Sequence, residues 1–127
     1  MTKPGYLLGS DAIIWYLRGK PRTVALLDEL AATEGPLGCS ALTLSEVLRG
    51  AKEDELPRTE RFLNRLVVLP VGAVEAKLAA SLMRQGGPGY VDCHVAATAV
   101  LADLTLVTYN LKDFRRTGAN LFDTSEC

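Results

Sequence analysis

Short apolar runs alternate with segments of helical periodicity along this chain. The runs predict strands at Tyr6–Leu8, Leu37–Ser40, Leu66–Pro70 and Leu104–Thr108, with Leu121-Phe122 as a candidate edge strand. Apolar residues at helical spacing predict helices at Asp11–Leu17, Arg22–Thr33, Thr43–Ala51, Glu53–Leu66, Val74–Met83 and Tyr90–Ala102. Strands that alternate with helices indicate parallel pairing, because parallel neighbours need a crossover connection. We therefore expect a three-layer α/β/α sandwich with a four- or five-stranded parallel sheet.

Two helices carry more specific signals. Asp11 stands where the first helix begins, and it is available as the N-cap of that helix. The Ala-rich helix at Tyr90–Ala102 is apolar nearly all round, which predicts that it is buried. It follows a loop rich in glycine, Gln85–Gly89.

Length and composition fit one globular domain spanning residues 1–127. Hydrophobic residues make up 48% of the chain, enough for a real core, and charged residues make up 23%. The net charge of −1 provides no overall field that attracts nucleic acid, so contacts to RNA would come from local basic groups. We see neither an apolar run long enough to span a membrane nor an export signal, and expect a cytoplasmic protein. Cys39, Cys93 and Cys127 are then reduced thiols.

Acidic and hydroxyl side chains follow the predicted strands. These candidates are Ser10 and Asp11 after the first strand, Ser40, Thr43 and Glu46 after the second, Thr108, Asn110 and Asp113 after the fourth, and Asp92 at the start of the Ala-rich helix. Ligands of open α/β sheets bind at the carboxyl ends of the strands, so we expect these groups at one edge. The chain offers no nucleophile–base pair, since its one histidine, His94, lies within the buried helix, and it has no phosphate-binding loop with the usual lysine.

Carboxylates that converge on one cleft repel each other unless a cation neutralises them. Mg²⁺ or Mn²⁺ suits such oxygen donors, activates water and stabilises charge on a phosphoryl group, so phosphodiester hydrolysis is the reaction this set fits best. Taken singly, each position has an ordinary structural explanation. Asp11 and Asp92 are good helix caps, Glu46 lies opposite the apolar face of its helix, and Asn110 and Asp113 are typical turn residues.

The candidate acids lie in three sequence blocks that occur in this order: "YLLGSDAIIWYLRG", "SALTLSEVLRGA" and "GGPGYVDCHVAATAVLADLTLVTYNLKDF". They resemble the PIN-domain nucleases, and among them the VapC-type toxins of toxin–antitoxin pairs. The resemblance runs from Tyr6 to about Phe122. It implies a PIN-like fold, a Mg²⁺- or Mn²⁺-dependent endoribonuclease that cuts RNA, a homodimer, and a VapB-like antitoxin that occupies the active-site groove.

The resemblance also assigns residues. Glu46 matches the second acid of the family and Asp92 the third, while Asn110 stands at the fourth, with Asp113 as the alternative. Gly9 stands where the first metal-binding aspartate is expected, and Asp11 occupies the third position of that motif. Three origins fit this sequence: an inactivating change, a naturally degenerate copy, or a natural variant that uses Asp11. The implied metal ligands here are Asp11, Glu46 and Asp92.

Two functions therefore remain open from the sequence. Glu46, Asp92, Asp11 and Asp113 favour the nuclease, whereas Gly9 and Asn110 favour a catalytically dead PIN-like module that pairs with an antitoxin or RNA. Candidate RNA contacts lie close to the acids in sequence, at Ser10, Thr108, Arg18, Arg49 and Lys112. An antitoxin groove is expected near the first helices, where Trp15, Tyr16 and Leu17 are available. A receiver-type phosphoacceptor is disfavoured because the third strand ends without an aspartate.

Overall fold

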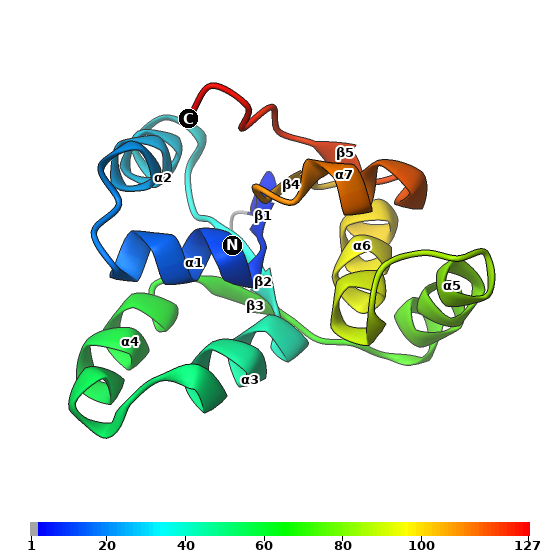
Figure 1. Cartoon of the computed structure of the whole chain (residues 1–127), viewed down its shortest axis with the longest axis horizontal. Helices are drawn as coiled ribbons and strands as arrows, with labels where there is room; N and C mark the ends of the chain where they lie inside the picture. The colour runs from blue at the N-terminus through cyan, green and yellow to red at the C-terminus, as the bar shows by residue number, and fades with distance from the viewer. Residues whose placement is uncertain (1–2) are drawn as a thin grey trace.

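The computed structural model describes residues 3–127, and this part of the chain forms a five-stranded sheet of order β3-β2-β1-β4-β5 (Figure 1). The strands are β1 (Tyr6–Leu8), β2 (Gly38–Ser40), β3 (Val67–Leu69), β4 (Thr105–Val107) and β5 (Asn120–Leu121). Every neighbouring pair is parallel. The predicted parallel sheet is confirmed, with β5 one residue earlier than Leu121-Phe122.

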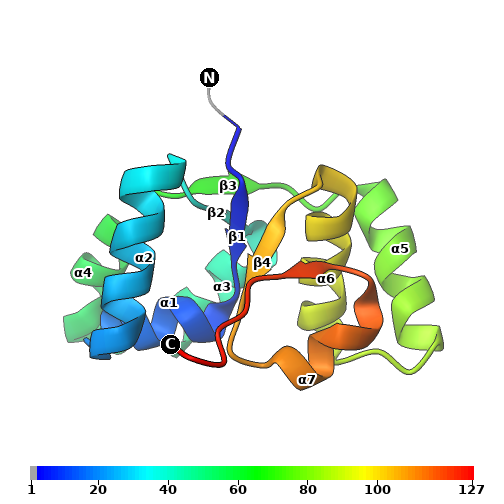
Figure 2. The ribbon, with the colours of Figure 1, turned by 90° about the horizontal axis from the view of Figure 1, so that it is seen from above.

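Helices cover both faces of the sheet, as the sequence predicts. They are α1 (Ser10–Leu17), α2 (Pro21–Glu34), α3 (Ala41–Gly50), α4 (Leu56–Leu63), α5 (Ala73–Arg84), α6 (Tyr90–Ala102) and α7 (Leu111–Phe114), with 3₁₀ turns η1 (Glu53–Glu55) and η2 (Arg115–Thr117). The group formed by α1, α2 and α4 lies on one side of the strands, and α5 and α6 lie on the other (Figure 2).

Alternation along the strands builds two separate cores. Leu8 and Val107 point into the cluster that contains α1, α2 and α4, while Leu7 and Leu106 point into the cluster under α5 and α6. All four side chains are completely buried. Successive strand residues face opposite sides of the sheet, so each pair of apolar residues contributes one side chain to each core. Burial of each such side chain stabilises the fold by roughly 1.5–3 kcal/mol.

The strand order places a switch point between β1 and β4. The chain moves from β1 outward to β2 and β3, then crosses back to add β4 on the other side of β1. Loops from these two central strands therefore diverge at their carboxyl ends, where open α/β sheets form a crevice. This crevice lies between residues from both ends of the chain.

Two predicted elements differ from the structure. The helix expected over Glu53–Leu66 is wrong: a 3₁₀ turn comes first and α4 begins only at Leu56. Pro57 explains the break, since proline lacks an amide hydrogen and fits only the first turn of a helix. The N-cap role expected of Asp11 is also wrong, because Gly9 occupies the cap and Asp11 lies inside the first turn.

The Ala-rich helix α6 is buried over its central part, from Cys93 to Ala99, as predicted. Its two ends are not, since Tyr90 and Leu101 are exposed. Cys39, Cys93 and Cys127 carry free thiols. Among residues 3–127, no helix combines the length and apolar character that a membrane crossing requires.

Candidate active site

A small cleft opens at the carboxyl ends of β1 and β4, at the switch point of the sheet. It has a volume of about 110 Å³. Its lining comes from α1, α6 and the segment after β4, and consists of Gly9, Ser10, Asp11, Asp92, Val95, Thr108, Asn110 and Phe114. The structure thus brings together in this lining Ser10, Asp11, Asp92, Thr108 and Asn110 of the candidates that the sequence placed after separate strands, and leaves out Ser40, Thr43, Glu46 and Asp113.

Asp11 is held in place by the segment that follows β4. The hydroxyl of Thr108 donates to both carboxylate oxygens of Asp11 at 3.1 Å, and the backbone N–H of Tyr109 donates to Oδ2 at 2.7 Å. These donors fix the carboxylate at the mouth of the cleft. A carboxylate has about four acceptor positions, so lone pairs remain for a cation.

Thr108 is itself fixed by two further hydrogen bonds. Its hydroxyl accepts from the backbone N–H of Asn110 at 3.1 Å, and its carbonyl accepts from the hydroxyl of Thr124 at 2.7 Å. The side chain is buried. Thr108 therefore acts as a rigid support for Asp11, since it has no freedom to turn its hydroxyl elsewhere.

Gly9 joins β1 to α1 beside this network. Its N–H donates to the carbonyl of Val107 at 2.9 Å, which ties the ends of β1 and β4 together. Its φ of −74° and ψ of 160° are extended values that any residue adopts. The backbone at this position therefore does not require glycine.

Asp92 lies in the first turn of α6 and is half-buried in the cleft. Burial raises the pKa of its carboxyl above the usual value, because the charged form loses solvent. The negative charges of Glu46, Asp11 and Asp113 raise that pKa further. Four acids from α1, α3, α6 and α7 therefore lie near enough for their charges to interact.

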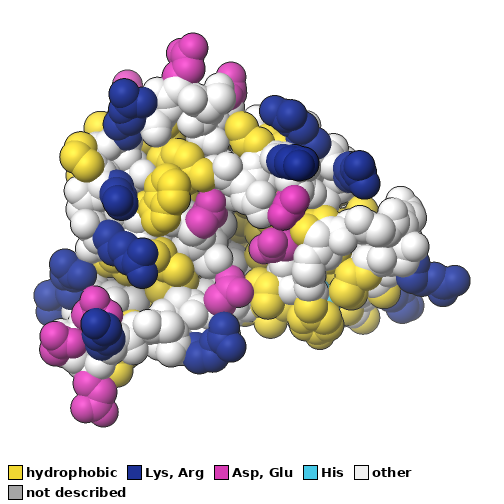
Figure 3. All heavy atoms as spheres, in the orientation of Figure 1, with side chains coloured by type: hydrophobic (Ala, Val, Ile, Leu, Met, Phe, Trp, Pro, Cys, Tyr) yellow, Lys and Arg dark blue, Asp and Glu magenta, His cyan; other side chains and the backbone are white. Residues whose placement is uncertain are grey.

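Acidic side chains gather around the centre of the face drawn in Figure 3, between α1, α3, α6 and α7. Glu46 reaches this region from α3, which packs against α6. It is half-buried and does not have the freely solvated position that its helical periodicity predicts on its own. Glu46 is half-buried because α3 packs against α6. The helical periodicity of α3 identifies the one apolar face of the helix and does not reveal this second contact.

Asn110 and Asp113 form a pair at the rim of the cleft. The side-chain nitrogen of Asn110 donates to Oδ2 of Asp113 at 2.9 Å, and both residues are exposed. Asn110 lines the cleft directly, whereas Asp113 borders a neighbouring hollow beside Gly86–Pro88. The amide nitrogen is thus engaged, which leaves the carbonyl oxygen of Asn110 as a neutral donor for a cation.

The donor set fits a hard divalent cation that keeps several waters. Over residues 3–127, no three His, Cys, Asp or Glu side chains are gathered closely enough to form a complete protein cage. Mg²⁺ does not need such a cage, because it is usually bound by one or two carboxylates with water and substrate phosphate. The mutual repulsion felt at Asp92 is the electrostatic condition that a cation would relieve.

The predicted basic contacts lie outside the cleft. Arg18 is at the end of α1 and borders a second groove, Arg49 is exposed in the last turn of α3, and Lys112 borders the hollow next to Asp113. Ser10 and Thr108 line the cleft itself. The hydroxyl of Thr108 is engaged with Asp11, so it supports the acid and is not free for substrate.

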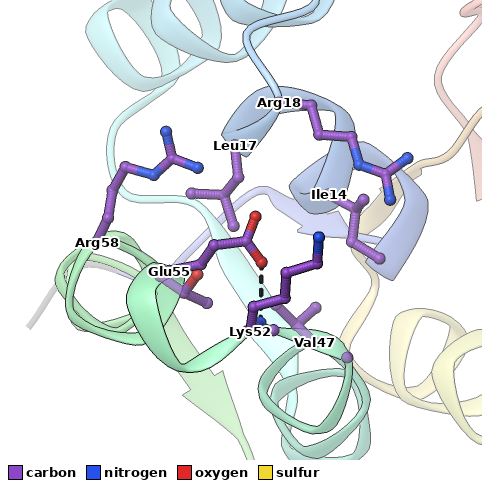
Figure 4. A pocket seen from close by; sticks show the side chains of 10 residues that line it. Ile14, Leu17, Arg18, Val47, Lys52, Glu55 and Arg58 are labelled. Carbon is purple, nitrogen blue, oxygen red and sulfur yellow. Dashed lines mark hydrogen bonds between the residues drawn. The ribbon is translucent and has the colours of Figure 1, made fainter.

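A second groove of about 260 Å³ separates α1, α3 and α4 (Figure 4). Ile14, Leu17 and Val47 form an apolar floor. Arg18, Lys52 and Arg58 project around it, with Glu55 fixed by the backbone N–H of Lys52 at 2.9 Å. Tyr16 and Leu17 continue into an adjoining hollow that Arg58, Arg61 and Arg65 border.

Tyr109 takes part in the network that holds Asp11, and the sequence does not reveal it. Its N–H holds Asp11, its hydroxyl shares a hydrogen bond of 2.8 Å with the hydroxyl of Thr23, and its ring stacks on Trp15. The only available signal is its place directly after Thr108 at the end of a strand next to β1. Backbone donors at such positions face the cleft, whatever the side chain.

Comparison with known proteins places this geometry among nucleases. The sequence model of the PIN domain family matches residues 6–120 of this chain. The chain is 32% identical over 113 residues to ribonuclease VapC19 of Mycobacterium tuberculosis, covering 85% of this chain and 90% of that protein. It is 30% identical over 123 residues to the tRNA(fMet)-specific endonuclease VapC of Shigella flexneri, covering 89% and 92%.

A solved structure shows the same likeness. VapBC2 from Rickettsia felis, bound to a DNA fragment from its promoter, superposes with a TM-score of 0.77 at 26% identity. The match covers 92% of this chain and 96% of that one. The resemblance to PIN-domain nucleases expected from the sequence is confirmed, as is the α/β/α fold.

Proposed function

The chain belongs to the PIN domain family of VapC ribonucleases, and we propose that it is a metal-dependent endoribonuclease toxin neutralised by a VapB-like antitoxin. It hydrolyses RNA phosphodiester bonds at the cleft between β1 and β4. The observation that carries this proposal is the cleft at the carboxyl ends of β1 and β4, where Asp11 of α1 and Asp92 of α6 line one cavity and the charges of Glu46 and Asp113 act on Asp92. Acids placed so that they repel each other indicate a site built for a cation.

Asp11, Glu46 and Asp92 are the proposed metal ligands for Mg²⁺ or Mn²⁺, of which one or two would bind the ion directly and the remainder through its waters. When bound, such an ion activates a water and neutralises charge that develops on the phosphoryl group. The chain supplies the orientation: Thr108 and Tyr109 hold the Asp11 carboxylate toward the cleft. Because the Thr108 hydroxyl and the Tyr109 N–H already hold the Asp11 carboxylate, it does not reorganise when substrate binds. Preorganisation of this kind lowers the activation barrier of the reaction.

Asn110 and Asp113 complete the proposed catalytic set at the rim. Their hydrogen bond holds the Asn110 amide in one orientation, with the carbonyl oxygen as the free end. Asp113 adds a negative charge that acts on Asp92. We assign Asn110 to the fourth position and Asp113 to its support.

Asp11 replaces the missing first acid in this proposal. Gly9 supplies no ligand, and the Asp11 carboxylate is fixed directly beside it by Thr108 and Tyr109. Of the three origins that fit the sequence, this arrangement favours a natural variant that uses Asp11. The chain would then cut RNA without an acid at position 9.

A catalytically dead binding module is the second candidate. Gly9 and Asn110 remove two of the charges that the family resemblance leads one to expect, and no complete three-ligand cage exists among the described residues. Such a module would bind RNA or antitoxin with the same surface but would not cut. It predicts that neither wild-type protein nor Gly9→Asp cleaves RNA with Mn²⁺.

Arg18, Arg49 and Lys112 are proposed phosphate contacts around the cleft. Each is close in sequence to an acid of the site, and Arg49 and Lys112 are exposed on the elements that carry Glu46 and Asp113. Phosphate contacts of this kind make RNA affinity fall with salt. They position the strand and do not select a sequence.

The groove between α1, α3 and α4 is the proposed antitoxin site. Its apolar floor suits the hydrophobic face of a partner helix, and its basic rim suits acidic residues beside that face. The test is complex formation with the cognate antitoxin after Arg58→Glu, an exposed rim residue. We expect affinity to fall about 5- to 30-fold, whereas Arg84→Glu on α5 leaves it unchanged.

The remaining proposals are a homodimer and a cytoplasmic location, where RNA and antitoxin are both present. The hairpin of α5 and α6 exposes Val74, Val100 and Leu101, apolar side chains that an interface between two copies would cover. Light scattering during size-exclusion chromatography should give twice the chain mass of 13.7 kDa. A monomer at high concentration would contradict the dimer.

The activity test uses purified protein, structured RNA and Mn²⁺. Internal cleavage by the wild type, lost in Asp92→Asn, supports the endoribonuclease. Cleavage only after Gly9→Asp would mean a silenced nuclease, and cleavage by neither would favour the binding module.

A further inference from the structure

Helix α1 carries an exposed tryptophan one turn after the acid of the cleft. Asp11 and Trp15 are four residues apart, so they lie on the same face of the helix, separated by about 6 Å along its axis. Trp15 is 38% exposed and is the single tryptophan of the sequence. A large aromatic side chain left open beside a polar cleft requires a reason, because its burial would be favourable.

Trp15 is backed by a rigid partner. Its ring stacks on Tyr109 with 4.6 Å between centroids and 27° between planes. Tyr109 is held at its hydroxyl by Thr23 of α2 and at its N–H by Oδ2 of Asp11. The indole therefore rests on a residue whose ring is held at its hydroxyl and whose backbone N–H binds the carboxylate of the cleft.

The second groove does not account for this aromatic pair. The part of α1 that lines the groove is Ile14, Leu17 and Arg18, and Trp15 is absent from that lining. A partner seated in the groove would thus contact a neighbouring face of α1. Trp15 is instead linked to the cleft through Tyr109, on which it stacks and whose N–H binds Asp11.

From this arrangement we propose that Trp15, backed by Tyr109, is a stacking platform for an unpaired RNA base next to the phosphodiester held at the cleft. The inference rests on the endoribonuclease function and names the form of its substrate. Every nucleobase has a face that stacks on an aromatic ring, but a base inside a duplex is already stacked. The platform selects single-stranded loops or ends and tolerates any base at that position.

The single tryptophan provides a direct readout that does not depend on cleavage. Intrinsic fluorescence is titrated with a 12-nucleotide single-stranded RNA in EDTA, and with a blunt duplex that contains the same strand. We expect saturable quenching of Trp15 by the single strand and little change with the duplex. Anisotropy of labelled RNA then measures the affinity of variants that lack the fluorophore.

Three variants separate stacking from general packing. Trp15→Ala should weaken single-strand binding about 5- to 100-fold, the range measured for loss of one base–aromatic stack. Trp15→Leu keeps an apolar side chain on Tyr109 and should lose the same affinity, whereas Trp15→Phe should stay within about threefold of wild type. Tyr90→Ala, at an exposed aromatic residue of α6, is the matched control and should have no effect.

Each outcome distinguishes the platform from the function on which it rests. If wild-type protein cleaves RNA while Trp15 emission stays constant and Trp15→Leu binds normally, the platform is wrong and the nuclease stands. If the Trp15 variants weaken only the antitoxin complex, the residue is a protein contact and the platform is wrong. If wild-type protein neither binds nor cuts RNA, the proposed function itself fails.

Discussion

Oδ1 of Asp11 lies 2.8 Å from the position that a β-carbon on Gly9 would occupy. That distance is too short for a real contact, so an aspartate at position 9 and the present conformation of Asp11 exclude each other. The remaining neighbours of this position, Thr108 Cβ and the Val107 carbonyl, are at 3.4 Å, which is ordinary contact. A side chain at position 9 therefore requires the Asp11 carboxylate to shift.

Removing the Asp11 charge should therefore abolish most activity. We expect Asp11→Asn to reduce RNA cleavage in Mn²⁺ by at least about 100-fold, since losses of roughly 10–100-fold already follow changes around metal ligands. The double variant Gly9→Asp/Asp11→Ala should recover activity, because it places the acid at position 9 and removes the side-chain oxygen that the new β-carbon would contact. Cleavage rates at fixed RNA concentration measure both effects, with Asp54→Asn, at an exposed residue of η1, as control.

The single variant Gly9→Asp distinguishes the origins of this sequence. Its new β-carbon forces Oδ1 of Asp11 to shift from its present position, so we expect no gain over wild type. Strong cleavage by Gly9→Asp together with an inert wild type would show that Asp11 does not replace the first acid.

Asp92 should destabilise the fold when no metal is bound. Folding raises its pKa above 3.8, so the folded state binds the proton more tightly than the unfolded state and stability falls as pH rises through this interval. Asp92→Asn should then melt a few degrees higher than wild type at pH 7 in EDTA, given that about 1 kcal/mol shifts such a domain by roughly 3–6 °C. Thermal melts by circular dichroism at pH 7, 5.5 and 4.5 test this.

The gain from Asp92→Asn should shrink toward the lowest pH, where the wild-type carboxyl becomes protonated. Asp54→Asn provides the reference for an exposed acid outside the cleft. A lower melting temperature for Asp92→Asn at pH 7 would contradict the repulsion among the acids.

Divalent metal should stabilise the wild type through the same acids. A ligand that binds only the folded state at 100 times its dissociation constant adds about 2.7 kcal/mol. Mn²⁺ and Mg²⁺ should therefore raise the melting temperature of wild-type protein by several degrees, and that of Glu46→Gln/Asp92→Asn much less. An equal shift in both proteins would place the metal elsewhere.

Lys112 should contribute one phosphate contact to RNA binding. Its replacement by alanine should lower the slope of log affinity against log salt by about 0.7, the value for one contact to a single strand. Lys77→Ala on α5 is the matched control, since Lys77 is an exposed lysine on a helix that does not line the cleft. If the slope of log affinity against log salt is the same in both variants, Lys112 does not contact an RNA phosphate.

Most of the fold follows from local pattern. Adjacent leucines such as Leu7 and Leu8 mark strands buried on both faces, and the helices between them leave only parallel topologies. The helix at Glu53–Leu66 was mispredicted because charged periodicity continues across Pro57, and only the structure shows that the helix begins at Leu56.

The site is less accessible to local reasoning. Asp11 has the sequence position of a helix cap, yet its carboxylate is drawn to donors nearly a hundred residues away, at Thr108 and Tyr109. Glu46 has the periodicity of a solvated residue, but the contact of α3 with α6 brings it near Asp92. Such relationships depend on which strands become neighbours, and short patterns along the chain do not encode them.

Cleavage of RNA by purified protein in Mn²⁺ gives the most direct test of the central claim, that Asp11 works in place of an acid at position 9. Wild type, Asp11→Asn and Gly9→Asp/Asp11→Ala are compared on one substrate. We expect internal cleavage by the wild type, its loss in the single variant and its return in the double variant. Wild-type cleavage that persists in Asp11→Asn would contradict it.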